Sequence, residues 1–300
     1  MSSPPIEVRN LNKRYKGGTW ANRDISLAAV RGEILGVVGP NGAGKTTLVR
    51  QITTELLPTS GEVRVFGIDA VTRPVEVKGL IGVMPQEATL YGGLSVRHQF
   101  RIFGKLRGLP GRIARRRRDE LIADLDLEEH GRKSTDALSG GLRRRVLLGI
   151  AAVADPPLLI LDEPSVGLDP EARHGLWDLL RRYRQEGKTV LLTTHYMEEA
   201  EELCDRVAII QDGSLLALDT VGNLHAAHGY RYKVTFTTTA GTRSLHGNDD
   251  RHLVARVQAM GIDQYSLTRT TLEDVYLVLT GGGPESAAEE DGDDEHHTAD

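Results

Sequence analysis

The sequence predicts an α/β fold with a largely parallel central sheet, and two observations support this. Short β-like runs alternate with helix-like stretches from about residue 30 to residue 218, the pattern of parallel strands joined by helical crossovers. The runs 158–161 and 190–193 are almost continuously apolar, as strands covered on both faces must be. Further runs of this kind occur at residues 34–38, 81–84 and 207–210.

Two segments around this core have other patterns. Residues 6–8 and 25–27 predict strands of a separate small antiparallel sheet, before the main alternation begins. Residues 96–107 and 113–125 have two amphipathic helical patterns with no strand between them, separated only by a Gly- and Pro-containing breaker. We therefore expect a helical subdomain, about residues 96–144, inserted in the α/β core. The Asp212-Gly213 pair between two apolar runs predicts a hairpin.

The pattern changes after residue 218, which predicts a main domain over residues 1–218 and a small α+β accessory domain over residues 219–284. No chemical motif is recognisable in this second part. The expected elements of the accessory domain are a strand at 230–236, a loop containing Gly241 and Gly247, a helix at 252–260 and a helix from Leu272.

Charge is distributed unevenly along the chain. Its 300 residues include 37 Lys plus Arg and 42 Asp plus Glu, a formal net charge of −5, which argues against nucleic-acid binding through bulk positive charge. Residues 285–300 contain eight acidic residues and no Lys or Arg, so residues 1–284 have 37 basic against 34 acidic residues. This composition predicts a disordered, solvated acidic tail; docking on a basic partner is the alternative.

The sequence also bears on compartment and membrane contact. Cys204 is the only cysteine, so no internal disulfide can form; we expect a reducing compartment and a buried structural thiol. No apolar run approaches the roughly 18 residues that span a bilayer, so a membrane role would need a partner chain. Four successive arginines, Arg115 to Arg118, predict a solvated helix paired with nearby acids, or a surface attracted to anionic lipid or to a membrane partner.

A glycine-rich segment after the run 34–38 fits the phosphate-loop pattern G-x-x-x-x-G-K-[ST]. The glycines allow backbone N–H groups to turn inward around a phosphate, and the following helix adds its positive end. Lys45 is expected to bridge the β- and γ-phosphates, and the Thr46 hydroxyl to bind Mg²⁺. The residues expected at the nucleotide are Gly39, Pro40, Asn41, Gly42, Ala43, Gly44, Lys45, Thr46 and Thr47.

Two adjacent acids, Asp162 and Glu163, directly follow the buried run 158–161. A phosphate loop needs a carboxylate at the end of a neighbouring strand to hold Mg²⁺. Because successive side chains of a strand point in opposite directions, the two carboxylates have different roles. Asp162 fits the metal, and Glu163 fits the general base that activates water.

A third motif, Ser139-Gly140-Gly141-Leu142, lies between the phosphate loop and the acidic pair. In this order, the three motifs resemble those of the ATP-binding cassette (ABC) ATPases over about residues 5–218. The resemblance implies ATP and Mg²⁺ as cofactors and a head-to-tail dimer, in which Ser139, Gly140 and Gly141 of one subunit contact the nucleotide of the other. The family signature usually ends in Gln, so Leu142 loses any hydrogen bond made there.

The resemblance assigns four further residues. Tyr15 matches the aromatic residue that stacks on adenine, although a packed surface tyrosine would have the same pattern. Gln86 matches the glutamine that touches Mg²⁺ and the attacking water, and Asp169 matches a loop that pairs across the dimer. His195 matches the histidine at the γ-phosphate, which together with Glu163 and Gln86 completes the expected catalytic set.

A single compact cassette is similar to the energising subunit of a transporter. The stretches 94–110 and 271–276 resemble the branch that includes bacterial drug-resistance, polysaccharide and lipid exporters. This implies a separately encoded transmembrane permease, a second ATPase subunit with a homodimer expected, no nucleic-acid partner, and a location at the cytoplasmic face of the cell membrane. The alternative is a non-transport ABC ATPase acting as a nucleotide-gated regulatory or nucleic-acid-linked module.

Overall fold

The computed structural model describes residues 3–228, 230–238 and 241–281, and the chain divides into two compact units, Met1–Val221 and Gly222–Asp300. The expected acidic tail, residues 285–300, lies outside the described residues. Among the helices of the described part, none is both long enough and apolar enough to cross a bilayer.

The first unit is built around a six-stranded sheet of order β10-β9-β3-β8-β7-β6. Only the β9–β10 pair is antiparallel, and the hairpin turn predicted at Asp212-Gly213 joins these two strands. Every residue of β3, β7 and β8 is buried, which confirms that both faces of the central strands are covered. The strands are β3 (Ile34–Val38), β6 (Ile81–Met84), β7 (Leu158–Asp162), β8 (Thr189–Thr194), β9 (Arg206–Gln211) and β10 (Ser214–Thr220).

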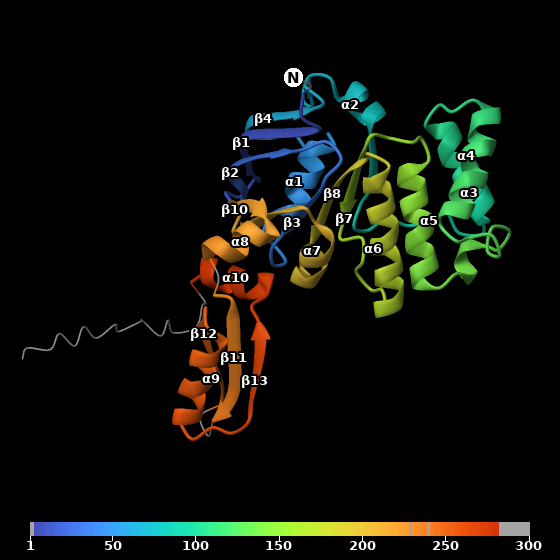
Figure 1. Cartoon of the computed structure of the whole chain (residues 1–300). Helices are drawn as coiled ribbons and strands as arrows, with labels where there is room; N and C mark the ends of the chain where they lie inside the picture. Colours follow the sequence, from blue (N-terminus) through green and yellow to red (C-terminus); the bar gives the residue numbers. More distant parts are fainter. Residues whose placement is uncertain (1–2, 229, 239–240, 282–300) are drawn as a thin grey trace, which may run out of the picture. The chain divides into compact units, whose positions relative to one another are not determined.

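A second, four-stranded sheet of order β2-β1-β4-β5 is antiparallel throughout, as the sequence predicted for its first two strands. Helix α1 (Lys45–Ile52) lies between the two sheets, and apolar side chains from both sheets and from α1 form one buried cluster (Figure 1). The strands are β1 (Ile6–Arg14), β2 (Trp20–Ala29), β4 (Ser60–Val65) and β5 (Ile68–Asp69).

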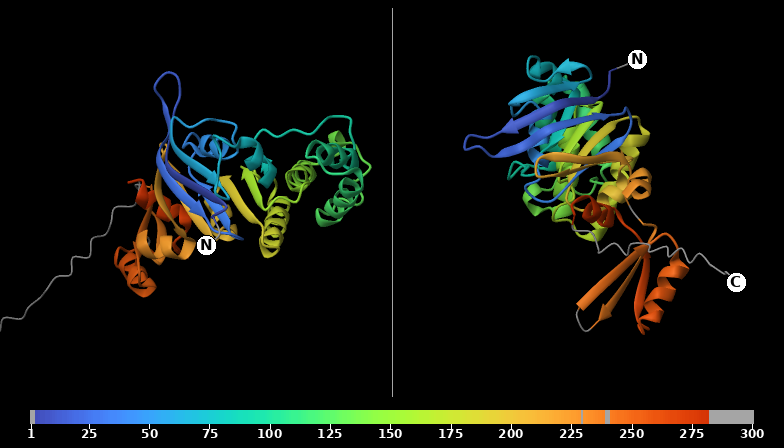
Figure 2. Two further views of the ribbon diagram at one scale, coloured as in Figure 1. Left: turned by 90° about the horizontal axis from the view of Figure 1, so that it is seen from above. Right: turned by 90° about the vertical axis from the view of Figure 1, so that its left-hand side faces the viewer.

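Helices cover the remaining parts of this unit. Helices α3 and α4 lie side by side and α3 packs against α5, so the helical subdomain predicted from the sequence is present (Figures 1 and 2). The bounds are α2 (Pro74–Leu80), α3 (Val96–Leu106), α4 (Gly111–Asp124), the 3-10 turn η1 (Thr135–Ala137), α5 (Gly140–Ala152), α6 (Pro170–Gln185) and α7 (Met197–Leu203). Cys204 follows α7 and is buried, as expected for a structural thiol.

The second unit contains a three-stranded antiparallel sheet of order β12-β11-β13. Helix α9 covers one face of this sheet, and their apolar side chains form a small core of their own (Figure 2). The elements after β10 are α8 (Val221–His228), β11 (Tyr232–Thr238), β12 (Gly241–Gly247), α9 (Asp250–Ala259), β13 (Tyr265–Arg269) and α10 (Leu272–Leu279).

One expectation for this part is wrong. The segment from Gly241 to Gly247 was expected to be a loop but forms the edge strand β12. An edge strand needs only one hydrogen-bonded neighbour, here β11, and most of its side chains remain partly or fully exposed. It therefore lacks the alternating apolar pattern on which strand prediction depends.

Candidate functional site

The phosphate loop lies at the carboxyl end of the central strand β3 and leads directly into α1. Gly44 caps α1 with a φ of 102°, a left-handed conformation that side chains rarely adopt. A Cβ atom on Gly44 would stand 2.1 Å from the carbonyl oxygen of Ala21, because the backbone of β2 packs directly against the loop at this point. Only glycine fits here, which explains why the loop motif requires it.

Two buried amides, which sequence reasoning missed, hold this loop. The Asn22 side chain in β2 donates to the carbonyl of Gly44 at 3.2 Å and accepts from the Gln51 amide at 2.7 Å. Gln51 in α1 also donates to the carbonyl of Thr47 at 3.2 Å. Asn22 and Gln51 are 0% and 2% exposed, and Asn22 occupies an inward position of β2 shared with apolar residues. A polar residue at such a position was the available signal.

Lys45 is buried within the loop that it follows. Its Nζ atom donates to the carbonyls of Gly39 at 2.7 Å and Pro40 at 3.1 Å, and lies 3.3 Å from Oε1 of Glu163. The side chains of Lys45 and Glu163 are only 5% and 3% exposed. The two charges are thus paired with little contact to water. Removing either partner would leave an unpaired buried charge, which lowers the stability of the fold.

Asp162 and Glu163 face different surroundings. Asp162 ends β7, whereas Glu163 follows the strand with a φ of 53°, so the left-handed turn, and not strand alternation, sets its direction. Asp162 accepts a hydrogen bond from the Thr193 hydroxyl of β8. Burial raises the pKa of the Asp162 carboxyl, although hydrogen bonds from Thr193 and Thr46 oppose the shift. The Glu163 carboxylate instead contacts Lys45 and His195, and its backbone N–H donates to the Thr193 carbonyl at 3.1 Å and hydroxyl at 3.0 Å.

His195 lies directly after β8, and its Nδ1 atom is 2.6 Å from Oε2 of Glu163. Strand β8 lies between β3 and β7, so the ends of these three neighbouring strands bring Lys45, Glu163 and His195 together. Each belongs to a different sequence motif. Their meeting depends on strand order and cannot be read from spacing.

Gln86 and Tyr15 approach the same region from other elements. Oε1 of Gln86, two residues after β6, is 3.5 Å from the hydroxyl oxygen of Thr46. The hydroxyl oxygen of Tyr15, which follows β1, is 3.4 Å from that of Thr47, and the residue is 41% exposed. A cavity of about 280 Å³ opens here. It is lined by Ala21, Asn41, Gly42, Ala43, Gly44, Lys45, Thr46, Thr47, Gln86 and Glu163.

Oxygen ligands suited to a divalent cation gather at Thr46, Gln86 and Asp162. Within the described part of the chain, no group of three or more His, Cys, Asp or Glu side chains could hold a metal. These residues fit Mg²⁺, which characteristically uses few protein ligands and completes its octahedron with water and nucleotide phosphates.

The remaining predicted residues do not line this cavity. Ser139 is the N-cap of α5, where its hydroxyl accepts from the backbone N–H of Leu142 at 3.4 Å, and it is exposed. Asp169 is the N-cap of α6 and accepts from the backbone N–H of Ala172 at 2.8 Å. Gly141 packs on α6, because a Cβ atom there would lie 2.9 Å from that of Ala172. Gly140 is exposed beside them.

A third residue missed from the sequence, Arg144, links helix α5 to the end of β7. Its guanidinium donates to the backbone carbonyls of Glu163 at 3.3 Å and Val166 at 3.5 Å. Burial lowers the pKa of Arg144, and the Glu163 carboxylate opposes this shift. The signature helix α5 is thus bonded to the segment carrying Glu163. In the sequence, Arg143, Arg144 and Arg145 follow the signature motif directly, and nothing distinguishes the one that contacts the segment after β7.

Comparison with known proteins agrees with this geometry. A family model described as ABC transporter matches residues 22–166. The chain is 38% identical to daunorubicin resistance ATP-binding protein DrrA3 of Streptomyces coeruleorubidus, over 94% of this chain and 97% of that protein. It is 40% identical to Nod factor export ATP-binding protein I of Burkholderia orbicola (strain AU 1054), over 94% and 98% respectively.

A solved structure of the ATP-binding cassette MJ0796, a dimer in a post-hydrolysis state bound to ADP and Pi, has the same fold. It matches with a TM-score of 0.65 and 26% identity over 72% of this chain and 98% of that one. These similarities confirm the resemblance to the exporter branch that the motifs indicated. The chain belongs to the ABC transporter family, as an ATP-binding subunit that hydrolyses ATP.

Proposed function

We propose that this ATPase drives export through a separate transmembrane permease, using the cluster of Lys45, Glu163 and His195 at the γ-phosphate. The observation that carries the proposal is the Glu163 carboxylate, buried and held between Nζ of Lys45 at 3.3 Å and Nδ1 of His195 at 2.6 Å. A general base must be positioned before it can take a proton from water. Here the positioning groups are already in contact with it.

ATP binding would redirect Lys45. The backbone N–H groups of residues 41–46 and the positive end of α1 favour the phosphates, and Lys45 can exchange its two loop carbonyls for phosphate oxygens. Glu163 then retains His195 as its partner and is free to accept a proton from water on the γ-phosphate side. Tyr15, partly exposed beside Thr47, is available to stack on the base.

Mg²⁺ would be held by Thr46, Gln86 and Asp162 together with nucleotide oxygens. When bound, the ion neutralises charge on the β- and γ-phosphates. The different surroundings of Asp162 and Glu163 support a division of work between them, in which Asp162 faces the cation and Glu163 faces the water.

A second copy of the chain is proposed to complete the site. Ser139, Gly140, Gly141 and Asp169 do not line the phosphate-loop cavity, yet Ser139 and the glycines begin a helix, where backbone N–H groups suit an anion. In a head-to-tail homodimer they would meet the γ-phosphate bound by the other subunit. The dimeric state of the ADP-bound relative supports this arrangement.

The domain organisation is part of the proposal. We assign residues 1–218 to the ATPase domain, with residues 96–144 as its helical part, and residues 219–284 to an accessory domain. Export is supported by two relatives that match over nearly their whole length, a daunorubicin resistance ATP-binding protein and a Nod factor export ATP-binding protein. A permease partner would place the protein at the cytoplasmic face of the cell membrane.

Two variants test the function. Lys45→Ala should abolish ATP binding, since it removes the one cation in the phosphate loop. Glu163→Gln keeps the shape and hydrogen-bonding capacity of the side chain but cannot take a proton, so turnover should fall by about 10²–10⁴-fold while ATP stays bound.

The same Glu163→Gln protein should accumulate as a dimer in saturating Mg-ATP, measured by light scattering after gel filtration. A monomer under these conditions would contradict the shared site. Near-zero turnover of the native chain reconstituted with its co-purifying permease would instead favour the nucleotide-gated module, and stimulation by DNA or RNA with strong salt dependence would favour the nucleic-acid-linked one.

A further inference from the structure

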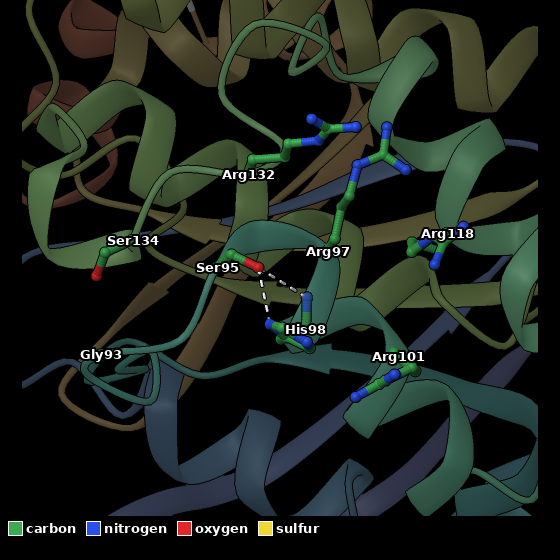
Figure 3. A pocket seen from close by; sticks show the side chains of 8 residues that line it. All are labelled: Gly93, Ser95, Arg97, His98, Arg101, Arg118, Arg132 and Ser134. Carbon is green, nitrogen blue, oxygen red and sulfur yellow. Dashed lines mark hydrogen bonds between the residues drawn. The ribbon is translucent and has the colours of Figure 1, made fainter.

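A second cavity, of about 470 Å³, lies in the helical part of the first unit, away from the phosphate loop. Four arginines line it, Arg97 and Arg101 from α3, Arg118 from α4 and Arg132 from the loop before η1. In the view of Figure 3, Arg97, Arg118 and Arg132 lie above the His98 ring and Arg101 lies below it. This volume is within the range of about 300–1,000 Å³ typical of small-ligand sites.

Backbone pairing fixes the loop that supplies Arg132. The N–H of Arg97 donates to the carbonyl of Gly131 at 3.0 Å, and the N–H of Thr135 donates to the carbonyl of Leu94 at 2.9 Å. These bonds clamp residues 131–135 against the start of α3. Arg97 and Arg132 therefore line the same cavity, despite a separation of 35 positions in the sequence.

The arginines have too few carboxylates among the described residues to neutralise them. Asp119 serves two of them, accepting from Arg97 Nη1 at 2.9 Å and from Arg118 Nη2 at 2.8 Å. Arg101 and Arg132 have no hydrogen bond or ion pair with any described side chain or carbonyl. Asp136 contacts two lining residues, accepting from the backbone N–H of Gly93 and from the Ser134 hydroxyl, and has no bond with the four arginine side chains.

One buried donor also lacks a partner. Nε of Arg97 is inaccessible to water and has no hydrogen-bond acceptor among the described residues. A buried N–H without an acceptor is unfavourable. This atom lies against the loop, since a Cβ atom on Gly131 would stand 3.1 Å from it, and the other nitrogens of the Arg97 guanidinium are the ones available to a ligand. The sequence around the cavity adds to the excess of positive charge, because residues 88–118 contain nine Lys and Arg and no Asp or Glu.

We propose that this cavity binds a phosphate group, at a site separate from the nucleotide. Guanidinium groups donate two parallel hydrogen bonds to phosphate oxygens, and converging arginines are stable together when an anion lies between them. Ser95 and His98, hydrogen-bonded to each other at 3.0 Å, add polar groups to the same wall. None of the lining residues belongs to the phosphate-loop cavity, so the two sites can be filled at once.

A phosphate group can come from a soluble phosphorylated molecule or from the headgroup of an anionic phospholipid, and the test has one arm for each. In the first arm, pyrophosphate is titrated calorimetrically into the full chain with saturating Mg-ADP, which occupies the nucleotide site. In the second arm, the full chain is floated with vesicles of phosphatidylglycerol or of phosphatidylcholine.

Two double variants are compared with the native chain in both arms. Arg101→Gln with Arg132→Gln removes the two unpaired pocket cations. Arg112→Gln with Arg115→Gln is the matched control, because it removes two exposed cations of α4 that do not line the cavity and have no partner among the described residues. Both variants change the net charge of the chain equally.

We expect the pocket variant to weaken binding about tenfold or more in at least one arm, since each guanidinium contributes charge-assisted hydrogen bonds, while the control stays within about twofold. Loss in the pyrophosphate arm identifies a soluble ligand, and loss with phosphatidylglycerol vesicles identifies a headgroup. Equal weakening by both variants, or no pocket-dependent binding in either arm, overturns the proposal. ATP affinity should be unchanged in the pocket variant, which separates this result from the test of the ATPase site.

Discussion

The buried Asn22–Gln51 pair yields a sharp prediction about the phosphate loop. Asn22→Leu removes the donor to the Gly44 carbonyl and the 2.7 Å acceptor of the Gln51 amide, both in a fully buried position. Each polar group left without its partner costs about 1–3 kcal/mol, and Gln51 keeps its bond to Thr47. The free energy of unfolding should therefore fall by about 2–4 kcal/mol.

The pair can be isolated by a double-mutant cycle. Gln51→Leu alone should cost about 1–3 kcal/mol, because it leaves Oδ1 of Asn22 without its donor. The double variant should cost less than the sum of the single ones by about 1–3 kcal/mol, since the Asn22–Gln51 bond is counted in both. Gln185→Leu, an exposed amide at the end of α6, is the control and should change stability by less than about 0.5 kcal/mol.

Urea unfolding followed by tryptophan fluorescence measures these values, because both tryptophans, Trp20 and Trp177, belong to the first unit. KM for ATP should rise with Asn22→Leu, as the loop loses the bond at Gly44. If the losses of stability of the two single variants add up to that of the double variant within about 0.3 kcal/mol, the reasoning is refuted, because independent sites behave in this way.

Two further predictions concern the helix contacts and the second unit. Gly141→Ala should slow ATP turnover and lower the free energy of urea unfolding by about 1–3 kcal/mol, because its methyl group would lie 2.9 Å from that of Ala172. Adding Ala172→Gly to this variant should restore turnover and stability. Failure of the second change to do so would exclude this contact as the cause. Burial acts to raise the pKa of the Asp274 carboxyl, but the nearby His246 ring, 3.8 Å away, and hydrogen bonds from Lys233 and the Thr271 backbone outweigh it and hold the pKa well below its ordinary value of 3.8. The Asp274 carboxylate thus contributes its full stabilisation above pH 3.8, and this contribution is lost as the pH falls through the lower folded pKa. Asp274→Asn disrupts the capping box that Thr271 and Asp274 form at the start of α10, so calorimetric melts should show a loss of about 0.5–2 kcal/mol at pH 7. On acidification below pH 3.8, the variant should lose less stability than the native chain. An equally steep loss in both proteins would contradict the assignment.

Several elements of the fold were predictable because their signals are local. The parallel strands 34–38 and 81–84 coincide with β3 and β6, since a strand buried on both faces has a continuous apolar run. The hairpin at Asp212-Gly213 follows from two residues that tolerate positive φ, here 49° and 78°. Strand β12 was missed because edge position leaves no apolar alternation.

The residues that hold the site in place were harder to find. Asn22 is 22 positions before Gly44, and Arg144 is 19 positions before Glu163, so no local pattern connects them. Arg97, Arg101, Arg118 and Arg132 likewise look like ordinary solvated arginines in the sequence. Their convergence depends on the pairing of residues 94–97 with the loop 131–135.

The sequence by itself determined the chemistry of this protein, because the phosphate loop is a set of consecutive residues whose glycines and lysine act within one turn of backbone. The tertiary structure decided which groups act together. Strand order places β8 between β3 and β7, which brings His195 and Lys45 to either side of Glu163. Such contacts arise from the hydrogen bonding of strands distant in the chain, and sequence spacing contains no record of that order.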